Sequence, residues 1–324
     1  MRTAEFRARA GSLTVLFLCS VMERRRLLQM LAEAGIPQRE RSELPDPDAG
    51  FDMEQVLDTG EGPAFVTEPD EPGPEAKMEI TPAGIEMYYT GTRLESWLRG
   101  APGGPLELGE GESGLAIAGL VYGWSTALTH TLALADRPLG LAELDLALES
   151  VSYAALEEHV DLMEGACLIE RLTDGDGETR YAVTDFLREG IAVIAAGARV
   201  ECHHPTSDTS PPDRLDAEAA FQLALPLLEL PKDVTGACRL GVQIDGGGLP
   251  GMAGATVTVE QSHVVSSTPQ LQRGVETWAS ASAIDWLDTL VEPTVARIEM
   301  GGDEHLAASL LAGLRERLFA PVPG

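Results

Sequence analysis

Residues 152–184 place one amphipathic helix directly before two short strands, and this order of elements strongly restricts the fold of the surrounding unit. The stretch reads SYAALEEHVDLMEGACLIERLTDGDGETRYAVT. Apolar residues at helical spacing end at a glycine, and two strand-like segments then follow on either side of a polar DGDG turn. We therefore predict a helix over 152–164, followed by a hairpin.

The same sequence carries a weak internal repeat. Residues 79–98 and 182–201 each read as the end of a strand, a threonine cap and an amphipathic helix, with Thr81 and Thr184 as the caps. The helical pattern at 12–35 matches the apolar run at 116–136, which we expect to be one helix.

Two copies of one α+β module are therefore expected, over residues 1–104 and 113–204, joined by the turn-rich stretch at 101–112. The first copy is degraded, because residues 40–79 are rich in acidic residues and proline where the equivalent of the 152–164 helix should stand. Proline at this density excludes a long helix.

A third unit is expected over residues 214–322. An apolar helix, DAEAAFQLALPLLEL, precedes the strand ACRLGVQI, in which alternate residues from Cys238 to Ile244 face inward. A hairpin, a helix, a strand and a closing helix follow. We predict an α+β domain with an antiparallel sheet, and α+β as the fold class of the whole chain.

The net charge restricts the classes of partner that the protein can bind. The 324 residues include 52 acidic and 23 basic ones, which gives a net charge of −29. A field of this sign repels nucleic acids and anionic membranes at long range. We therefore expect no membrane partner.

Four widely spaced cysteines without a CxxC pair favour a reducing, cytoplasmic location. The N-terminal run SLTVLFLCSVM after several arginines is similar to a signal peptide, but no cleavage site follows it. Its apolar spacing continues toward Gly35, so we interpret it as a core helix.

Six segments together resemble a known protein family. They are ITPAGIEM (80–87), GLVYGWSTALTHTLALADRPLGLAELD (119–145), SYAALEEHVDLMEGACLIE (152–170), YAVTDFLREGIAVIAAGARVE (181–201), FQLALPLLELP (221–231) and ARIEMGGDEHLAASLLAGL (296–314). The whole chain resembles bacterial, mainly actinobacterial, proteins with tandem HxlR-like winged helix-turn-helix modules and a C-terminal sterol-carrier-like domain. The resemblance implies a transcriptional regulator tuned by a small apolar ligand.

The chain departs from this pattern where the family reads DNA. The helix at 152–164 would be the recognition helix, which in this family is typically arginine-bearing, yet it offers only acidic charges: Glu157, Glu158, Asp161 and Glu164. Phosphate contacts need Arg and Lys. DNA is therefore a doubtful partner.

Scarce aromatic residues gather where the two modules are expected to meet, and we predict that they line a site for an apolar or aromatic small molecule. The candidate ligand-binding residues are Tyr88, Tyr89, Trp97, Tyr122, Trp124 and His130. A plain core between the modules is the alternative. His130, with Thr126 and Thr129 nearby, is also the candidate catalytic residue, against a hydrogen-bonded core histidine.

Other motifs offer little chemistry. A tunnel in the third unit, lined by Trp278 and Trp286, is as reasonable as a closed core. Cys202, His203 and His204 are adjacent and lack a spaced set of partner ligands, so no metal is predicted. No cofactor motif is present, since GGGLPG at 246–251 precedes a strand and is interpreted as a turn.

These observations favour a small-molecule-binding protein on a repurposed winged-helix scaffold, for sequestration, self-protection or a biosynthetic step. A ligand-responsive regulator that binds DNA is the first alternative, with Arg24, Arg25 and Arg26 as its best basic residues. An enzyme acting on a bound polycyclic metabolite through His130 is the second. The sequence leaves a homodimer open.

Overall fold

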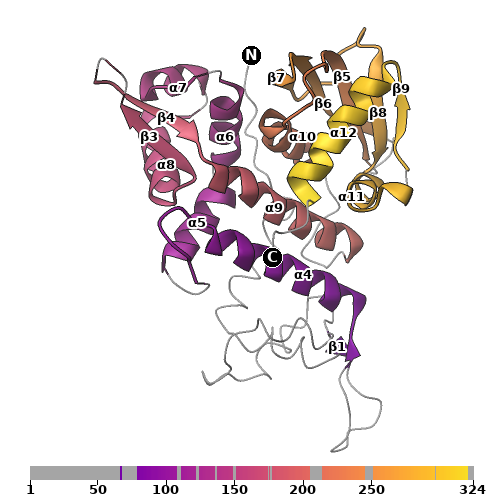
Figure 1. Cartoon of the computed structure of the whole chain (residues 1–324), viewed down its shortest axis with the longest axis horizontal. Coiled ribbons are helices and arrows are strands. Elements are labelled where there is room, and N and C mark those ends of the chain that lie inside the picture. The colour runs from indigo at the N-terminus through magenta and orange to yellow at the C-terminus, as the bar shows by residue number, and fades with distance from the viewer. Residues whose placement is uncertain are drawn as a thin grey trace, which may run out of the picture.

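The computed structural model shows an α+β protein (Figure 1). It describes residues 66–67, 79–107, 111–121, 124–135, 137–148, 151–173, 175, 177–204, 214–244, 251–295 and 297–319. The helix predicted at 12–35, Arg24–Arg26, Tyr122 and nearly all of the GGGLPG turn lie outside this part, as does most of the first predicted module. A short pair of antiparallel strands, β1 (Val66–Thr67) and β2 (Glu79–Ile80), precedes the first described helix.

The helix-hairpin unit, residues 111–204, contains five helices and one hairpin in its described residues. They are α5 (Gly111–Val121), α6 (Ser125–Leu134), α7 (Leu141–Ala147), α8 (Tyr153–Gly165), β3 (Ile169–Thr173), β4 (Thr179–Val183) and α9 (Asp185–His203). An isolated bridge between Leu139 and Tyr181 adds a third chain segment beside the hairpin. The helix and hairpin predicted from 152–184 are confirmed, with α8 capped by Ser152 and α9 capped by Thr184.

Glutamate 143 holds the start of α7 to the hairpin. Its carboxylate accepts a hydrogen bond from the main chain of Gly140 and pairs with Arg137 and Arg180. The hydrogen bond from Arg137, helped by that from Gly140, lowers the pKa of Glu143 to about 2. The loop before α7 and strand β4 are thereby held around one charge on α7.

Helix α9 runs through the centre of the molecule, with α4 (Pro82–Arg99) packed along it (Figure 1). These are the two helices that the internal repeat relates. The Trp97 indole stacks on Phe186 with ring centroids 4.6 Å apart and donates a hydrogen bond to the Phe186 carbonyl at 2.8 Å. Gly190 allows this contact, since a Cβ there would lie 3.0 Å from the indole.

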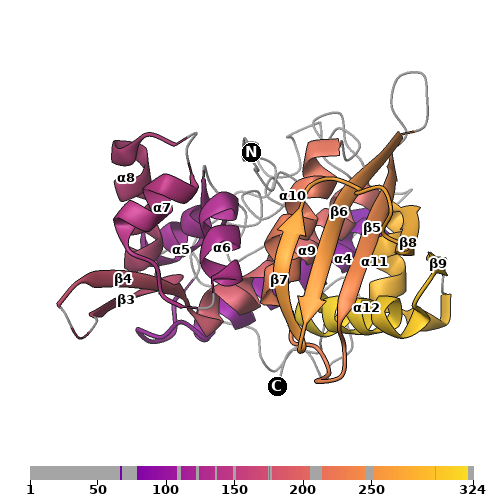
Figure 2. The same ribbon diagram turned by 90° about the horizontal axis from the view of Figure 1, so that it is seen from above.

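The C-terminal unit, residues 214–319, places helices behind a five-stranded sheet (Figure 2). Its helices are α10 (Arg214–Ala224), α11 (Ala283–Val291) and α12 (Glu304–Phe319), with short 3-10 turns at η2 (Leu225–Leu227) and η3 (Pro293–Val295). Its strands are β5 (Gly236–Ile244), β6 (Gly251–Glu260), β7 (His263–Thr268), β8 (Thr277–Ser282) and β9 (Glu299–Gly301), in the order β7-β6-β5-β8-β9. Cys238, Leu240 and Val242 point into the core, as predicted, and burial raises the pKa of the Cys238 thiol to about 12.

Two predictions about these units were wrong. The sheet is mixed, because β5 and β8 are parallel. Strand β8 was missed: its sequence TWASAS is short and rich in small polar residues, which gives little strand signal. The run at 116–136 is also two helices rather than one, since Trp124 stands at a turn with φ −90° and ψ 7° before α6.

No helix within the described residues combines the length and the apolar character needed to cross a bilayer.

Candidate functional site

Helix α6 brings His130 against the C-terminal unit. It packs on α10, η2 and β7, so the two units share a seam at this point. Polar residues of α6 are buried in or near this seam, including Ser125, Thr126 and Thr129, each with 3% exposure or less. Burying a polar group costs free energy unless it is hydrogen-bonded. A buried polar atom at the seam that lacks a hydrogen bond therefore needs an explanation.

The imidazole of His130 is incompletely paired. Its Nε2 atom is buried and has no hydrogen-bond partner. Burial lowers the pKa of His130 below its usual value, while hydrogen bonding to the main chain of Ser267 and to the side chain of Gln222 raises it by a smaller amount. A neutral imidazole with a free Nε2 therefore faces the seam near neutral pH.

Gln222 of α10 supplies the second unpaired group. Its side chain is completely buried, and its amide nitrogen donates to the Ser267 hydroxyl of β7 at 2.9 Å. The other end of the amide, Oε1, is buried without a hydrogen-bond partner. The seam thus contains a carbonyl oxygen and an imidazole nitrogen, on two different units, that lack a well-formed hydrogen bond, although the two side chains are close enough for Gln222 to raise the pKa of His130.

The predicted aromatic residues that the structure describes lie in different surroundings. Trp97 is buried against Phe186, and Tyr89 on α4 is 58% exposed. Trp124 is half-buried at the start of the helix that carries His130. The side chain of Tyr88 and all of Tyr122 lie outside the described residues. Their roles in ligand binding stay predictions.

The two tryptophans of the C-terminal unit are placed differently. Trp286 of α11 is buried, meets Phe221 edge-on at 5.4 Å, and donates to the Gly241 carbonyl at 2.8 Å. Trp278 is half-buried against Gly301. The tunnel predicted between them stays a prediction.

The exposed face of α8 is acidic, and its nearest arginine is already paired. Glu157, Glu158 and Asp161 are exposed on the helix, whereas Leu156, Val160 and Met163 are buried. Arg171 of β3 binds Glu164 at 2.5 Å and approaches Asp161.

The same pairing holds across the helix-hairpin unit. Its five arginines all form ion pairs with carboxylates: Arg137, Arg171, Arg180, Arg188 and Arg199. Residues 111–204 contain no lysine. In this unit, every arginine that could contact a DNA phosphate is therefore already paired with a carboxylate.

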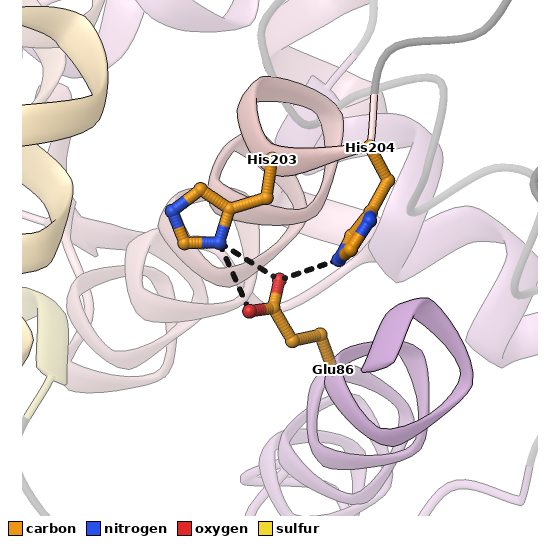
Figure 3. A group of neighbouring side chains, drawn as sticks. All are labelled: Glu86, His203 and His204. Atoms are coloured by element: carbon orange, nitrogen blue, oxygen red, sulfur yellow. Dashed lines mark hydrogen bonds and ion pairs between the residues drawn. The ribbon is translucent and has the colours of Figure 1, made fainter. Parts of the chain in front are cut away.

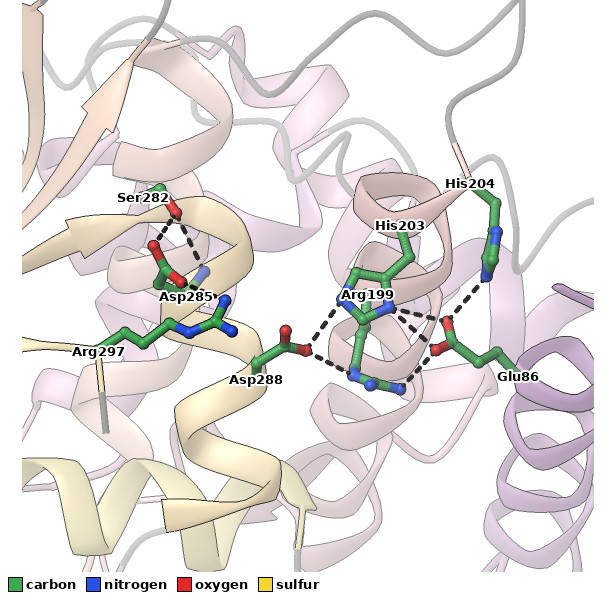
Figure 4. A network of polar contacts seen from close by, with 8 residues as sticks. All are labelled: Glu86, Arg199, His203, His204, Ser282, Asp285, Asp288 and Arg297. Atoms are coloured by element: carbon green, nitrogen blue, oxygen red, sulfur yellow. Dashed lines mark hydrogen bonds and ion pairs between the residues drawn. The ribbon is translucent and has the colours of Figure 1, made fainter. Parts of the chain in front are cut away.

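A second polar cluster joins α4, α9 and α11 (Figure 4). Arg199 of α9 lies between two carboxylates, with Nη1 3.1 Å from Glu86 Oε1 and Nε 3.4 Å from Asp288 Oδ1. His203, one turn later, spans the same two residues: Nδ1 is 2.9 Å from Glu86 Oε1 and Nε2 is 2.9 Å from Asp288 Oδ1. We call these four residues, with His204, the three-helix junction.

Sequence patterns proposed His130 as a site residue, rejected His203 and His204 as metal ligands, and missed the partners of all three. Gln222 lies 92 positions from His130 in a helix that reads simply as apolar, and Glu86 is 117 positions from His203. Only the packing of α6 on α10, and of α4 on α9, brings these groups together. One available signal was the repeat itself, which relates α4 to α9.

Comparison with known proteins adds no relative. No protein-family model, curated protein or solved structure matches the chain.

Proposed function

We propose that this protein binds an apolar or aromatic small molecule at the seam between its helix-hairpin and C-terminal units, on a winged-helix scaffold that no longer reads DNA. The observation that carries the proposal is the pair of buried, unpartnered atoms, His130 Nε2 and Gln222 Oε1. Buried polar groups without partners are uncommon, and each costs about 1–3 kcal/mol. A ligand hydroxyl would donate to Gln222 Oε1 and pair with His130 Nε2.

The scaffold assignment rests on the order of elements. Helix α6, the Leu139 bridge, helices α7 and α8, and the β3–β4 hairpin follow the winged-helix order, which makes α8 the equivalent of a recognition helix. We also propose that the C-terminal unit is sterol-carrier-like, because its sequence resembles that of such domains. Sequestration, self-protection and a biosynthetic step are all roles that such binding would serve.

Loss of DNA binding follows from charge. Counterion release by Arg and Lys supplies most of the affinity of a protein for duplex DNA. The α8 face presents carboxylates, and the hairpin arginines Arg171 and Arg180 are held by Glu164 and Glu143. The net charge of −29 adds long-range repulsion.

Two ligands that differ in one group test the binding site. Calorimetric titration with 2-naphthol and with naphthalene asks whether an aromatic ring binds and whether the hydroxyl matters. We expect 2-naphthol to bind about 5-fold to 10-fold more tightly, which corresponds to one net hydrogen bond. Replacing Gln222 by Leu should remove this preference, and equal affinities in the unaltered protein would contradict the seam as the site.

A mobility-shift titration tests the DNA side of the proposal. Duplex fragments from around the gene, at physiological salt, should show no specific shift. A specific complex at nanomolar protein would support the regulator instead and would place its DNA contacts on residues other than the arginines of the helix-hairpin unit.

A further inference from the structure

The end of α9 places two imidazoles around one carboxylate (Figure 3). Ligand atoms of Glu86, His203 and His204 all lie within 4.8 Å of one another. Neighbouring residues inside a helix point about 100° apart and do not normally converge. Here α9 ends at His203, and His204 leaves the helix with φ −128° and ψ 64°, which turns its ring back toward Glu86.

From this geometry we propose that Glu86, His203 and His204 form a binding site for a divalent transition metal of the zinc class. The ligand atoms are Glu86 Oε2, His203 Nδ1 and His204 Nε2. The carboxylate oxygen is 3.3 Å from the first nitrogen and 3.5 Å from the second. Tetrahedral zinc with bonds of about 2.0–2.1 Å separates its ligands by about 3.3–3.4 Å, so these spacings already fit a shared ion.

The imidazole of His204 is only weakly paired. Its Nε2 atom is buried and approaches Glu86 Oε2 at 3.5 Å, but it makes no well-formed hydrogen bond. A ring nitrogen without a hydrogen-bond partner is the form that binds a metal.

The other ring, His203, is held in the orientation that coordination requires. Its Nε2 atom lies 2.9 Å from Asp288 Oδ1, so an N–H there donates to the carboxylate, and an ion bound at Nδ1 would replace the contact that Nδ1 makes with Glu86. A carboxylate behind a histidine ligand is the usual support for zinc, because it fixes the tautomer and makes the ring more basic. Arg199 meanwhile occupies Glu86 Oε1 and leaves Oε2 for the metal.

Charge also favours a cation at this point. The two carboxylates of the junction exceed its single arginine by one negative charge, and the C-terminal end of α9 adds the negative pole of its dipole. Two imidazoles and one carboxylate suit zinc better than magnesium or calcium, which prefer oxygen ligands. Three protein ligands leave one position of the ion for water.

The test uses untagged, full-length protein that has been stripped with a chelator. Calorimetry with ZnCl2 should show one ion per chain, and Co²⁺ should give the visible absorption of a four-coordinate site. His204→Ala should weaken zinc binding by at least about 10-fold, and Asp288→Asn, which removes only the support behind His203, by about 10-fold to 100-fold. Glu86→Gln is a second ligand variant, with circular dichroism to show that each variant is folded.

His305→Ala is the matched control, since His305 is exposed and faces Asp233 at 3.3 Å without a third ligand. Zinc binding that is unchanged in this variant and lost in His204→Ala supports the site. Absence of zinc binding to the unaltered protein, or equal affinity in His204→Ala, would overturn the proposal and leave the junction as a set of ion pairs.

Discussion

Two polar regions hold the C-terminal unit to the rest of the described chain, and they are paired in opposite ways. At the three-helix junction, Arg199 and His203 each reach both Glu86 and Asp288. At the seam, Gln222 is completely buried, and Gln222 and His130 each keep one buried polar atom without a well-formed hydrogen bond. The junction is charged and half-exposed, whereas the seam is neutral at neutral pH and closed.

This difference in pairing suggests different roles for the two regions. Charges that bridge three helices restrain how the units sit relative to one another. Neutral polar groups that are buried without a well-formed hydrogen bond lower the stability, and a ligand that pairs with them would recover that free energy. We therefore propose that the junction anchors the units, in addition to its proposed metal site, and that the seam recognises the ligand.

Arg199→Ala should have the largest effect on stability. It leaves two carboxylates close together in the junction, each 25% exposed or less, without their shared arginine. We expect the free energy of unfolding to fall by about 2–3 kcal/mol, below the 3–5 kcal/mol of a fully buried pair because water still reaches these groups. Urea denaturation measures the change.

Arg297→Ala is the control for that variant. Arg297 pairs with Asp285 at 3.1 Å but is 58% exposed, so its removal should cost no more than about 1 kcal/mol. Equal losses in the two variants would show that the junction is an ordinary surface ion pair.

Gln222→Leu should change stability much less, although Gln222 is completely buried. The variant loses the hydrogen bond to Ser267 and also removes the unpaired carbonyl, and these two effects oppose each other. We expect a change within about 1 kcal/mol. A loss as large as that of Arg199→Ala would contradict the contrast between the two regions.

The helices and caps of the helix-hairpin unit could be predicted from the sequence because their signals are local. Ser152 and Thr184 precede apolar residues at helical spacing, and both cap helices in the structure. Cys238, Leu240 and Val242 alternate, and all three are buried. Propensity and periodicity act over a few residues, so one sequence suffices for them.

Pairing across the chain could not be predicted in the same way. The parallel contact of β5 with β8 and the approach of Glu86 to His203 join segments that no local pattern connects. The break before α6 was also hidden, because the apolar run continues through it. Side-chain partners such as Gln222 depend on these long-range contacts.

Acid should weaken the seam. Burial lowers the pKa of His130, so the unfolded chain binds a proton more readily than the folded chain. Stability from the neutral ring is complete above about pH 6.5 and falls as the pH drops below that value. The free energy of unfolding of the unaltered protein, minus that of His130→Gln, should therefore decrease between about pH 7.5 and about pH 5.5. A difference that stays constant over this range would show that His130 is not the cause.

High salt should change the stability differences least, and it should affect the junction but not the seam. High ionic strength screens half-exposed charges, with a Debye length of about 3 Å at 1 M. The stability difference between the unaltered protein and Arg199→Ala should shrink in 1 M NaCl. The difference for Gln222→Leu should stay the same, because no net charge is involved.

Nuclear magnetic resonance of the histidine side chains tests the central claim most directly. The chain has six histidines, so each imidazole ¹⁵N signal is assignable from single His→Gln variants. Saturation with 2-naphthol should shift the Nε2 signal of His130, as its unpaired atom gains a hydrogen bond, while the signals of His203 stay in place. Binding that leaves the His130 signals unchanged would contradict the assignment of the ligand to the seam.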